Sequence, residues 1–178
     1  MLFTDRSIWT MVHGIGLGGA ALLGLGAALF HLYAARASGE TYLAMQDASS
    51  RALAWLAVVT AAMLWLTVLL GTYVIFPLYR ATPPGGVTDF SQYPRSLIQA
   101  NPDTVWLHTF AMESKEHAPW IASMLATAVA FVFVRYRSKA LRDASLRTML
   151  TIMLAICFAL VSWVSLLGVF VNKVAPLQ

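Results

Sequence analysis

Charged residues are scarce in this sequence. Asp, Glu, Lys and Arg together make up 11% of its 178 residues, whereas 59% of the residues are hydrophobic. A water-soluble domain usually contains about 25% charged residues, because its surface must be solvated. The composition therefore indicates an integral membrane protein.

The sequence also lacks the motifs of several enzyme classes. It has one cysteine, Cys157, so a CxxC redox or metal site is excluded, and no phosphate-binding loop or Ser–His–Asp set is found. Cys157 lies within an apolar run, where we expect it to serve packing. A di-iron carboxylate bundle needs Glu-x-x-His motifs, but the residue three positions before His117 is Ser114.

What the sequence does contain is long apolar runs. Each of the four holds 18 residues or more, enough for a helix to cross a hydrocarbon layer of about 30 Å, and none alternates as a membrane β-barrel does. The first run is about twice the length of a signal-peptide core, so we expect a retained helix. We predict one all-α domain, residues 1–178, that forms an integral membrane four-helix bundle. The predicted spans are about 8–34, 53–78, 117–134 and 148–171.

Basic residues predict the orientation of the bundle. The short loop 134–147 is the most basic segment of the chain, with Arg135, Arg137, Lys139, Arg142 and Arg147. By the positive-inside rule this loop is cytoplasmic, which puts both termini and the loop 80–116 on the outer, periplasmic side. The net charge of +4 is explained in this way and does not indicate a nucleic-acid partner.

The outer loop 80–116 divides into two parts. Its first half contains PPGG and prolines at 83, 84 and 94, which break helices. Its second half has a helix-start signal, with Asn101 as a cap and Pro102 at the first helical position. We predict a short amphipathic helix that lies near the outer surface before the third span, with a kink near Pro119.

The first span is rich in glycine. Residues 16, 20, 24 and 28 (Gly, Ala, Gly, Ala) form a stripe of small residues that lets a neighbouring helix or a flat ring approach closely. His13 precedes Gly16 by three residues and Ala20 by seven, so we expect it on the same face. Gly16 and Ala20 are therefore candidates to make room for a macrocycle, while packing on a neighbouring helix explains the stripe equally well.

His13 and His117 are the candidate metal ligands. Both are expected near the outer surface at similar depth, on two helices that could face each other, as the two axial ligands of a b-type haem must. Glu113, four residues before His117, would orient its imidazole or lie near a haem propionate, and Lys115 would meet a propionate as a point charge. The alternative is an interfacial hydrogen-bond network without a cofactor.

The other two histidines have weaker roles. His108 is an alternative haem ligand, and with Met112 four residues later it offers a copper-binding pair. His31 lies at the other end of the first span and is expected to reach lipid head groups. Because only the first span has histidines near both ends, one haem is the most that the sequence supports.

Four spans with His13 and His117 at one end resemble the small four-helix membrane anchors that carry haem b in respiratory and photosynthetic electron-transfer complexes. The segment LHTFAMESKEHAPW (107–120), followed by an Ala-rich helix, is similar to segments of uncharacterised bacterial membrane proteins. The resemblance implies one haem b near the outer face of a bacterial inner membrane. Such a chain would relay electrons between subunits of a complex or to an external carrier, and would not be an enzyme alone.

Two rival functions stay open at this point. The chain could be a non-redox scaffold that docks a partner subunit through the outer loop, or a copper-handling membrane protein using His108, Met112 and His117. The aromatic residues Tyr73, Phe76 and Tyr79 form a belt at the outer surface and could also line the edge of a quinone or haem site.

Overall fold

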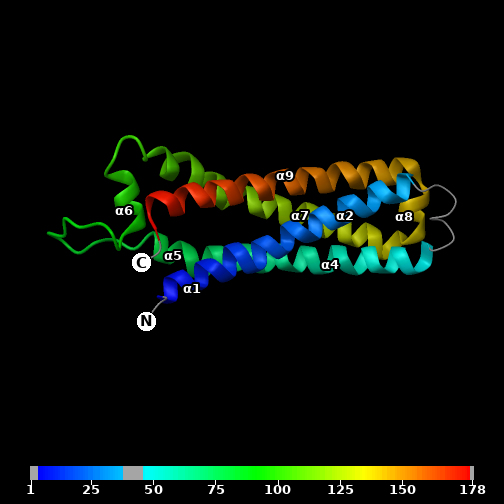
Figure 1. Ribbon diagram of the computed structural model, residues 1–178, viewed down its shortest axis with the longest axis horizontal. Helices are drawn as coiled ribbons and strands as arrows, with labels where there is room; N and C mark the ends of the chain where they lie inside the picture. Colours follow the sequence, from blue (N-terminus) through cyan, green and yellow to red (C-terminus); the bar gives the residue numbers. More distant parts are fainter. Residues whose placement is uncertain (1–3, 38–45, 177–178) are drawn as a thin grey trace.

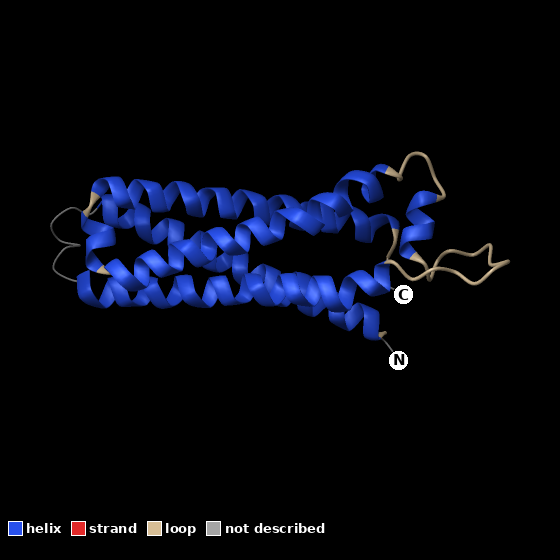
Figure 2. Cartoon of the chain, turned by 180° about the vertical axis from the view of Figure 1, so that it is seen from behind, coloured by secondary structure: helices blue, strands red, loops and turns tan. Residues whose placement is uncertain are grey.

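The computed structural model describes residues 4–37 and 46–176, and every regular element within these ranges is helical (Figure 2). Four helical stretches are long and apolar enough to cross a membrane: Asp5–Ala37, Ala48–Tyr79, Leu107–Tyr136 and Ala144–Val174. Each contains one of the predicted spans and extends beyond it, because helix geometry continues into flanking residues that are less apolar. The chain is thus an all-helical, multi-pass membrane protein.

The spans are built from successive helical elements (Figure 1). The first consists of α1 (Asp5–Met11), the π-helical segment η1 (Val12–Gly18) and α2 (Gly19–Ala37). The second consists of α4 (Gln46–Leu70), η2 (Gly71–Ile75) and α5 (Phe76–Tyr79), and the third of η3 (Leu107–Met112) and α7 (Glu113–Tyr136). Between these two lies α6 (Pro94–Gln99), and α8 (Ser138–Arg142) precedes the fourth span, α9 (Ala144–Val174).

Side-chain caps start two of the spans. Thr4 caps α1 by accepting a hydrogen bond from the Ser7 backbone N–H at 3.2 Å. Asp143 caps α9, with its carboxylate accepting from the N–H groups of Ser145 and Leu146 at 3.0 Å each. Each cap satisfies backbone donors that the first turn of a helix leaves unpaired.

The first and third spans lie on a diagonal of the bundle. The α2 helix packs against α4 and α9, and α7 packs against the same two helices. Both termini lie at one end of the bundle together with α6, and we call this the terminal end; α8 lies at the opposite end (Figure 1). A group bound in the middle of the bundle would therefore be reached from opposite sides by the first and third spans.

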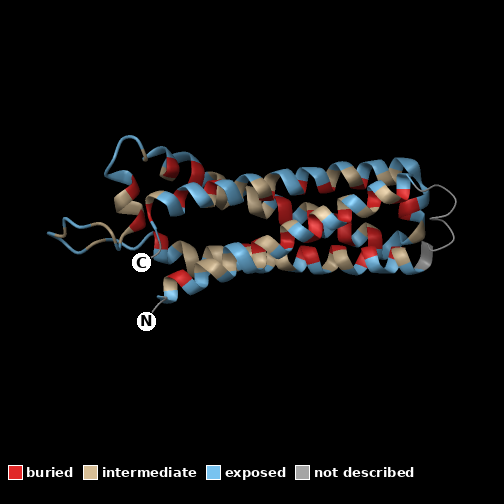
Figure 3. Cartoon of the chain, viewed as in Figure 1, coloured by how far each residue is buried: buried red, intermediate tan, exposed pale blue. Residues whose placement is uncertain are grey.

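Two separate clusters of buried residues form the core (Figure 3). The larger fills the bundle towards the α8 end and contains Leu25, Leu64 and Phe133 among many alanines. The smaller lies at the terminal end, where Tyr79 and Ile98 pack with residues of η3 and α9. Small residues of the larger cluster let the backbones of α2 and α4 approach closely, as is usual in membrane helix pairs.

The outer loop differs from the sequence prediction in two respects. Pro94 does not break a helix but begins α6, because the first position of a helix needs no N–H donor. Residues 101–105 form turns, so the helix before the third span begins later than the predicted start at Asn101 and Pro102, and η3 runs directly into α7. Pro119 lies inside α7.

Three of the four spans contain a π-helical segment, and all three segments belong to the terminal half of the bundle. A π-helical turn contains one more residue than an α-helical turn, so it shifts the side chains that follow it to a different face. Such segments are often found at functional sites. In the terminal half, the regular α-helical geometry of three spans is therefore interrupted.

Gly24 is predicted to be essential for the packing of α2 on α4. A Cβ at this position would overlap the side-chain hydroxyl of Thr60, whereas a Cβ at Gly19 would meet no atom within 4 Å. Gly24→Ala should lower the free energy of unfolding by about 1–3 kcal/mol through overpacking.

The matched control is Gly19→Ala, which should leave the stability unchanged or raise it, since alanine favours the helix by about 1 kcal/mol. Tryptophan fluorescence during SDS titration of the detergent-purified chain measures both variants. Equal stabilities would show that the α2–α4 contact is looser than the structure indicates.

Candidate functional site

A cavity of about 780 Å³ lies between the two core clusters, inside the terminal half of the bundle. Leu64 and Val161 of the larger cluster line it on one side, and Tyr79, Met112 and Val171 of the smaller cluster line it on the other. All four spans contribute to its wall, which is mostly apolar. Cavities of this size and composition are typical of cofactor sites.

His13 enters the cavity from η1 of the first span. Its ring lies against Gly71 of the second span, so closely that a Cβ there would be 2.8 Å from His13 Cε1. The imidazole also interacts with the backbone of Thr67, one turn earlier in α4. Its Nδ1 atom is buried and has no hydrogen-bond partner in the described part of the chain. A buried polar atom of this kind is rare and calls for a ligand or a water molecule.

His117, an exposed residue of α7 in the third span, also lines the cavity. Its Nδ1 lies 2.8 Å from the backbone oxygen of Glu113, and since a carbonyl oxygen only accepts, Nδ1 carries the proton. The Nε2 atom of the neutral ring then keeps its lone pair. Metal-binding histidines are commonly oriented by such a bond to a backbone carbonyl.

Lys115 is the third ionisable residue that the structure brings to the cavity. Its ammonium group reaches α9 at Gly168, where a Cβ would be 3.0 Å from Nζ. It acts electrostatically on His13, although the two residues belong to diagonal spans. Within residues 4–37 and 46–176, Lys115 forms neither a hydrogen bond nor an ion pair.

Polar groups gather where the cavity approaches the terminal end. Arg6 of α1 lines the cavity, and its Nη1 atom is buried with no hydrogen-bond partner among the described residues. Glu116 also lines it and acts electrostatically on Tyr79. The hydroxyl of Tyr79 is hydrogen-bonded to Nδ1 of His108 at 2.9 Å, which ties the end of the second span to η3.

The structure thus places His13, Lys115 and His117, three of the predicted site residues, around one cavity. Glu113 is exposed and supplies its backbone carbonyl to His117, whereas its carboxylate was expected to act. His108 does not line the cavity.

Gly16 and Ala20 are exposed and do not line the cavity, so neither makes room for a ligand there. The prediction that Gly16 and Ala20 share a helix face with His13 assumed a regular α-helix from His13 to Ala20. Because η1 is a π-helix, the face is shifted, and Gly14, Ile15 and Gly18 line the cavity in their place. The inner part of the stripe, Gly24 and Ala28, is buried in the bundle.

Three residues of the site were not expected from the sequence. Gly71 and Gly168 provide the space for the His13 ring and the Lys115 ammonium group. Each is an isolated glycine in an otherwise apolar span, which is a signal of close approach, but the approaching side chain comes from another span. Arg6 precedes the first apolar run, and nothing in the sequence indicates that it lines a cavity inside the bundle.

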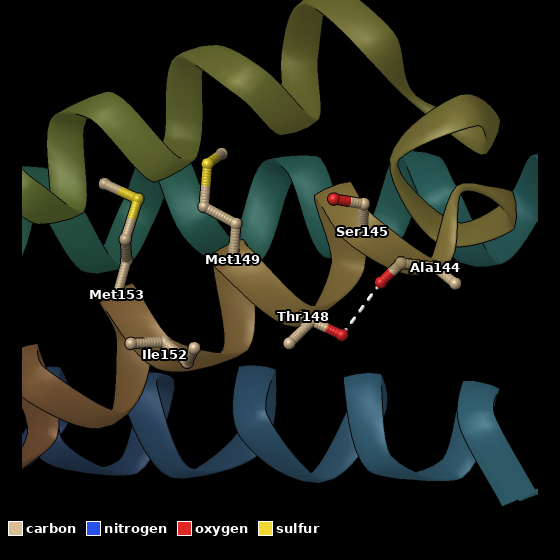
Figure 4. A pocket seen from close by; sticks show the side chains of 6 residues that line it. All are labelled: Ala144, Ser145, Thr148, Met149, Ile152 and Met153. Atoms are coloured by element: carbon tan, nitrogen blue, oxygen red, sulfur yellow. Dashed lines mark hydrogen bonds between the residues drawn. The ribbon is translucent and has the colours of Figure 1, made fainter.

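A second hollow lies on the surface of α9 near the α8 end (Figure 4). Among the described residues its wall holds no histidine and no charged side chain, and the Thr148 hydroxyl on this wall donates to the Ala144 carbonyl at 2.8 Å. We therefore assign no function to it. Its lining residues are Ala144, Ser145, Thr148, Met149, Ile152 and Met153.

Removing the cation from the cavity should stabilise the ligand-free protein. In Lys115→Met a flexible apolar side chain replaces an ammonium group that has no partner among the described residues and lies in a mostly apolar wall, and we expect the free energy of unfolding to rise by about 1 kcal/mol. SDS titration of the two purified chains measures the difference.

The control is Lys173→Met, in which an exposed cation in the last turn of α9 is lost. This substitution should not stabilise the protein, because the ammonium group is already hydrated there. A loss of stability in Lys115→Met would show that Lys115 has a structural partner.

Comparison with protein-family models, with curated proteins and with solved structures gave no match. Among the described residues, no three His, Cys, Asp or Glu side chains are grouped so that they could hold a metal ion by themselves. The features of the described residues that bear on function are the cavity, its two histidines, and two cations without partners in this part of the chain.

Proposed function

We propose that this chain is a membrane subunit of an electron-transfer complex and binds one b-type haem in the cavity, with His13 and His117 as axial ligands. The observation that carries the proposal is that these histidines come from diagonal spans and line the same cavity. Two imidazoles that approach from opposite sides are what six-coordinate haem iron requires. Two side-chain ligands are enough because the porphyrin supplies the others.

The residues present fit such a group in three ways. The cavity volume of about 780 Å³ is within the range of sites for large organic ligands, and its wall is mostly apolar. His117 is held by the Glu113 carbonyl so that Nε2 is available. His13 has a buried ring nitrogen without a partner among the described residues, and its ring is held in place by contact with Gly71.

The protein's own contribution is to orient and shield the group. The bound haem would supply one-electron chemistry, while His13 and His117 would hold it and the surrounding spans would shield it from water. Because the cavity lies in one half of the bundle, the haem would exchange electrons with a partner at the terminal end. We assign that end to the outer, periplasmic face of a bacterial inner membrane, since the basic loop 134–147 lies with α8 at the opposite end.

Of the two rival functions, copper handling has less support from the site. The scaffold function would use exposed aromatic rings near the terminal end: Trp106 and Phe110 contact Phe170 and Trp163 of α9 edge-on but stay 43% and 51% exposed. A copper site would require His108, but the Nδ1 atom of this residue is hydrogen-bonded to Tyr79 and its side chain does not line the cavity.

The test is a dithionite-reduced minus oxidised visible spectrum of the detergent-purified chain, expressed with ample haem precursor and quantified as pyridine haemochrome. The wild type should show a sharp α-band and about one haem per chain, as expected for bis-histidine haem b. His13→Ala and His117→Ala should each lose the band, because either substitution removes an axial ligand.

His31→Ala is the matched control, since His31 lies near the opposite end of the first span, and it should keep full occupancy. Gly71→Ala should reduce occupancy although it alters no ligand, because the added Cβ displaces the His13 ring. A wild-type protein that folds but shows no haem absorption would refute the proposal and favour the scaffold function.

A further inference from the structure

The charges that line the cavity are not balanced. Within the described ranges, the charged residues in its wall are Arg6, Lys115 and Glu116, so two cations face one carboxylate. Arg6 is half-buried, and its Nη1 atom is buried without a hydrogen-bond partner among the described residues. Lys115 has neither a hydrogen bond nor an ion pair with the described residues. Ionisable residues of this kind inside a membrane protein or at its boundary are candidates for ligand binding.

The position of Lys115 is built into the bundle. The residue belongs to the third span, but its ammonium group lies beside Gly168 of the fourth span, where an added Cβ would be 3.0 Å from Nζ and would push the ammonium group aside by a few tenths of an ångström. From there it acts on His13 of the first span. Lys115 thus lines the cavity that would hold the haem, although part of its side chain stays exposed.

We propose that Arg6 and Lys115 form an anion cradle that binds the two propionate carboxylates of the haem and so determines which edge of the ring faces the terminal end. This inference rests on the proposed function. Carboxylates would supply the partners that both cations lack, and charge-assisted hydrogen bonds to carboxylates are the strongest that either side chain forms. A small free anion would satisfy the cations but would leave the apolar wall of the cavity unfilled.

The proposal can be tested by changing the propionate carboxylates of the ligand while the rest of the haem stays the same. The experiment is a titration of the haem-free, detergent-purified chain with haem b and, separately, with haem dimethyl ester, in which both propionates are blocked. The wild type should bind haem b at least about tenfold more tightly than the diester, since the ester cannot form ion pairs with the cradle. Both ligands should give the same bis-histidine spectrum.

The variants locate the origin of this preference. Lys115→Met and Arg6→Gln should each bind haem b more weakly while their affinity for the diester stays at the wild-type level, so that the preference shrinks or disappears. Gly168→Ala keeps the charge of Lys115 but moves the ammonium group, and it should lose part of the preference. Lys173→Met removes an exposed cation at the same end of α9 and should keep all of it.

The outcomes separate this inference from the proposed function. If both ligands bind with equal affinity, or if Lys115→Met and Arg6→Gln keep the wild-type preference, the cradle is refuted and the haem site stands. If neither ligand binds to the folded wild type, the haem site itself is refuted, and the cradle with it. Diester binding with the bis-histidine spectrum serves as the folding control for every variant.

Discussion

The cavity depends on the contact between the His13 ring and the backbone at Gly71. A polar ring can stand between two membrane spans only where one of them lacks a side chain, and Gly71 provides that space. Gly168 does the same for the ammonium group of Lys115. In a bundle whose core is otherwise filled by leucine and alanine, these two glycines decide where ionisable groups can turn inward.

The π-helical segments change which side chains three of the spans direct towards the cavity. Towards the α8 end, α2, α4, α7 and α9 pack with small residues in regular contact. Towards the terminal end, η1, η2 and η3 change the faces that three of the spans present, and a cavity separates the two core clusters. The larger cluster provides stability, whereas the terminal half contains buried polar atoms of Arg6 and His13 that have no hydrogen-bond partner among the described residues. Such a division between a stable scaffold and an imperfectly satisfied site is common in functional proteins.

The site combines two features that neither a simple scaffold nor a simple ion site needs. Two histidines enter from diagonal spans, and two cations lack partners within the described residues. A packed interface would cover such groups with complementary charge, and an ion site would gather more ligands around a smaller space. A large, mostly apolar ligand that carries both a metal and carboxylates accounts for the histidines, the cations and the apolar wall together.

The sequence by itself determined the membrane class, the helical fold and the approximate positions of the four spans, because a span must hide its backbone in hydrogen bonds and its side chains in hydrocarbon. It also pointed to His13, Lys115 and His117, since ionisable residues beside an apolar run are costly. Only the tertiary structure decided which faces of the helices meet. The π-helical η1 turned Gly16 and Ala20 outward, and packing between distant segments brought Gly71 to His13, Gly168 to Lys115 and Arg6 to the cavity. Contacts between spans do not follow from the periodicity of one helix, because they depend on how neighbouring helices are rotated and on where their regular turns are interrupted.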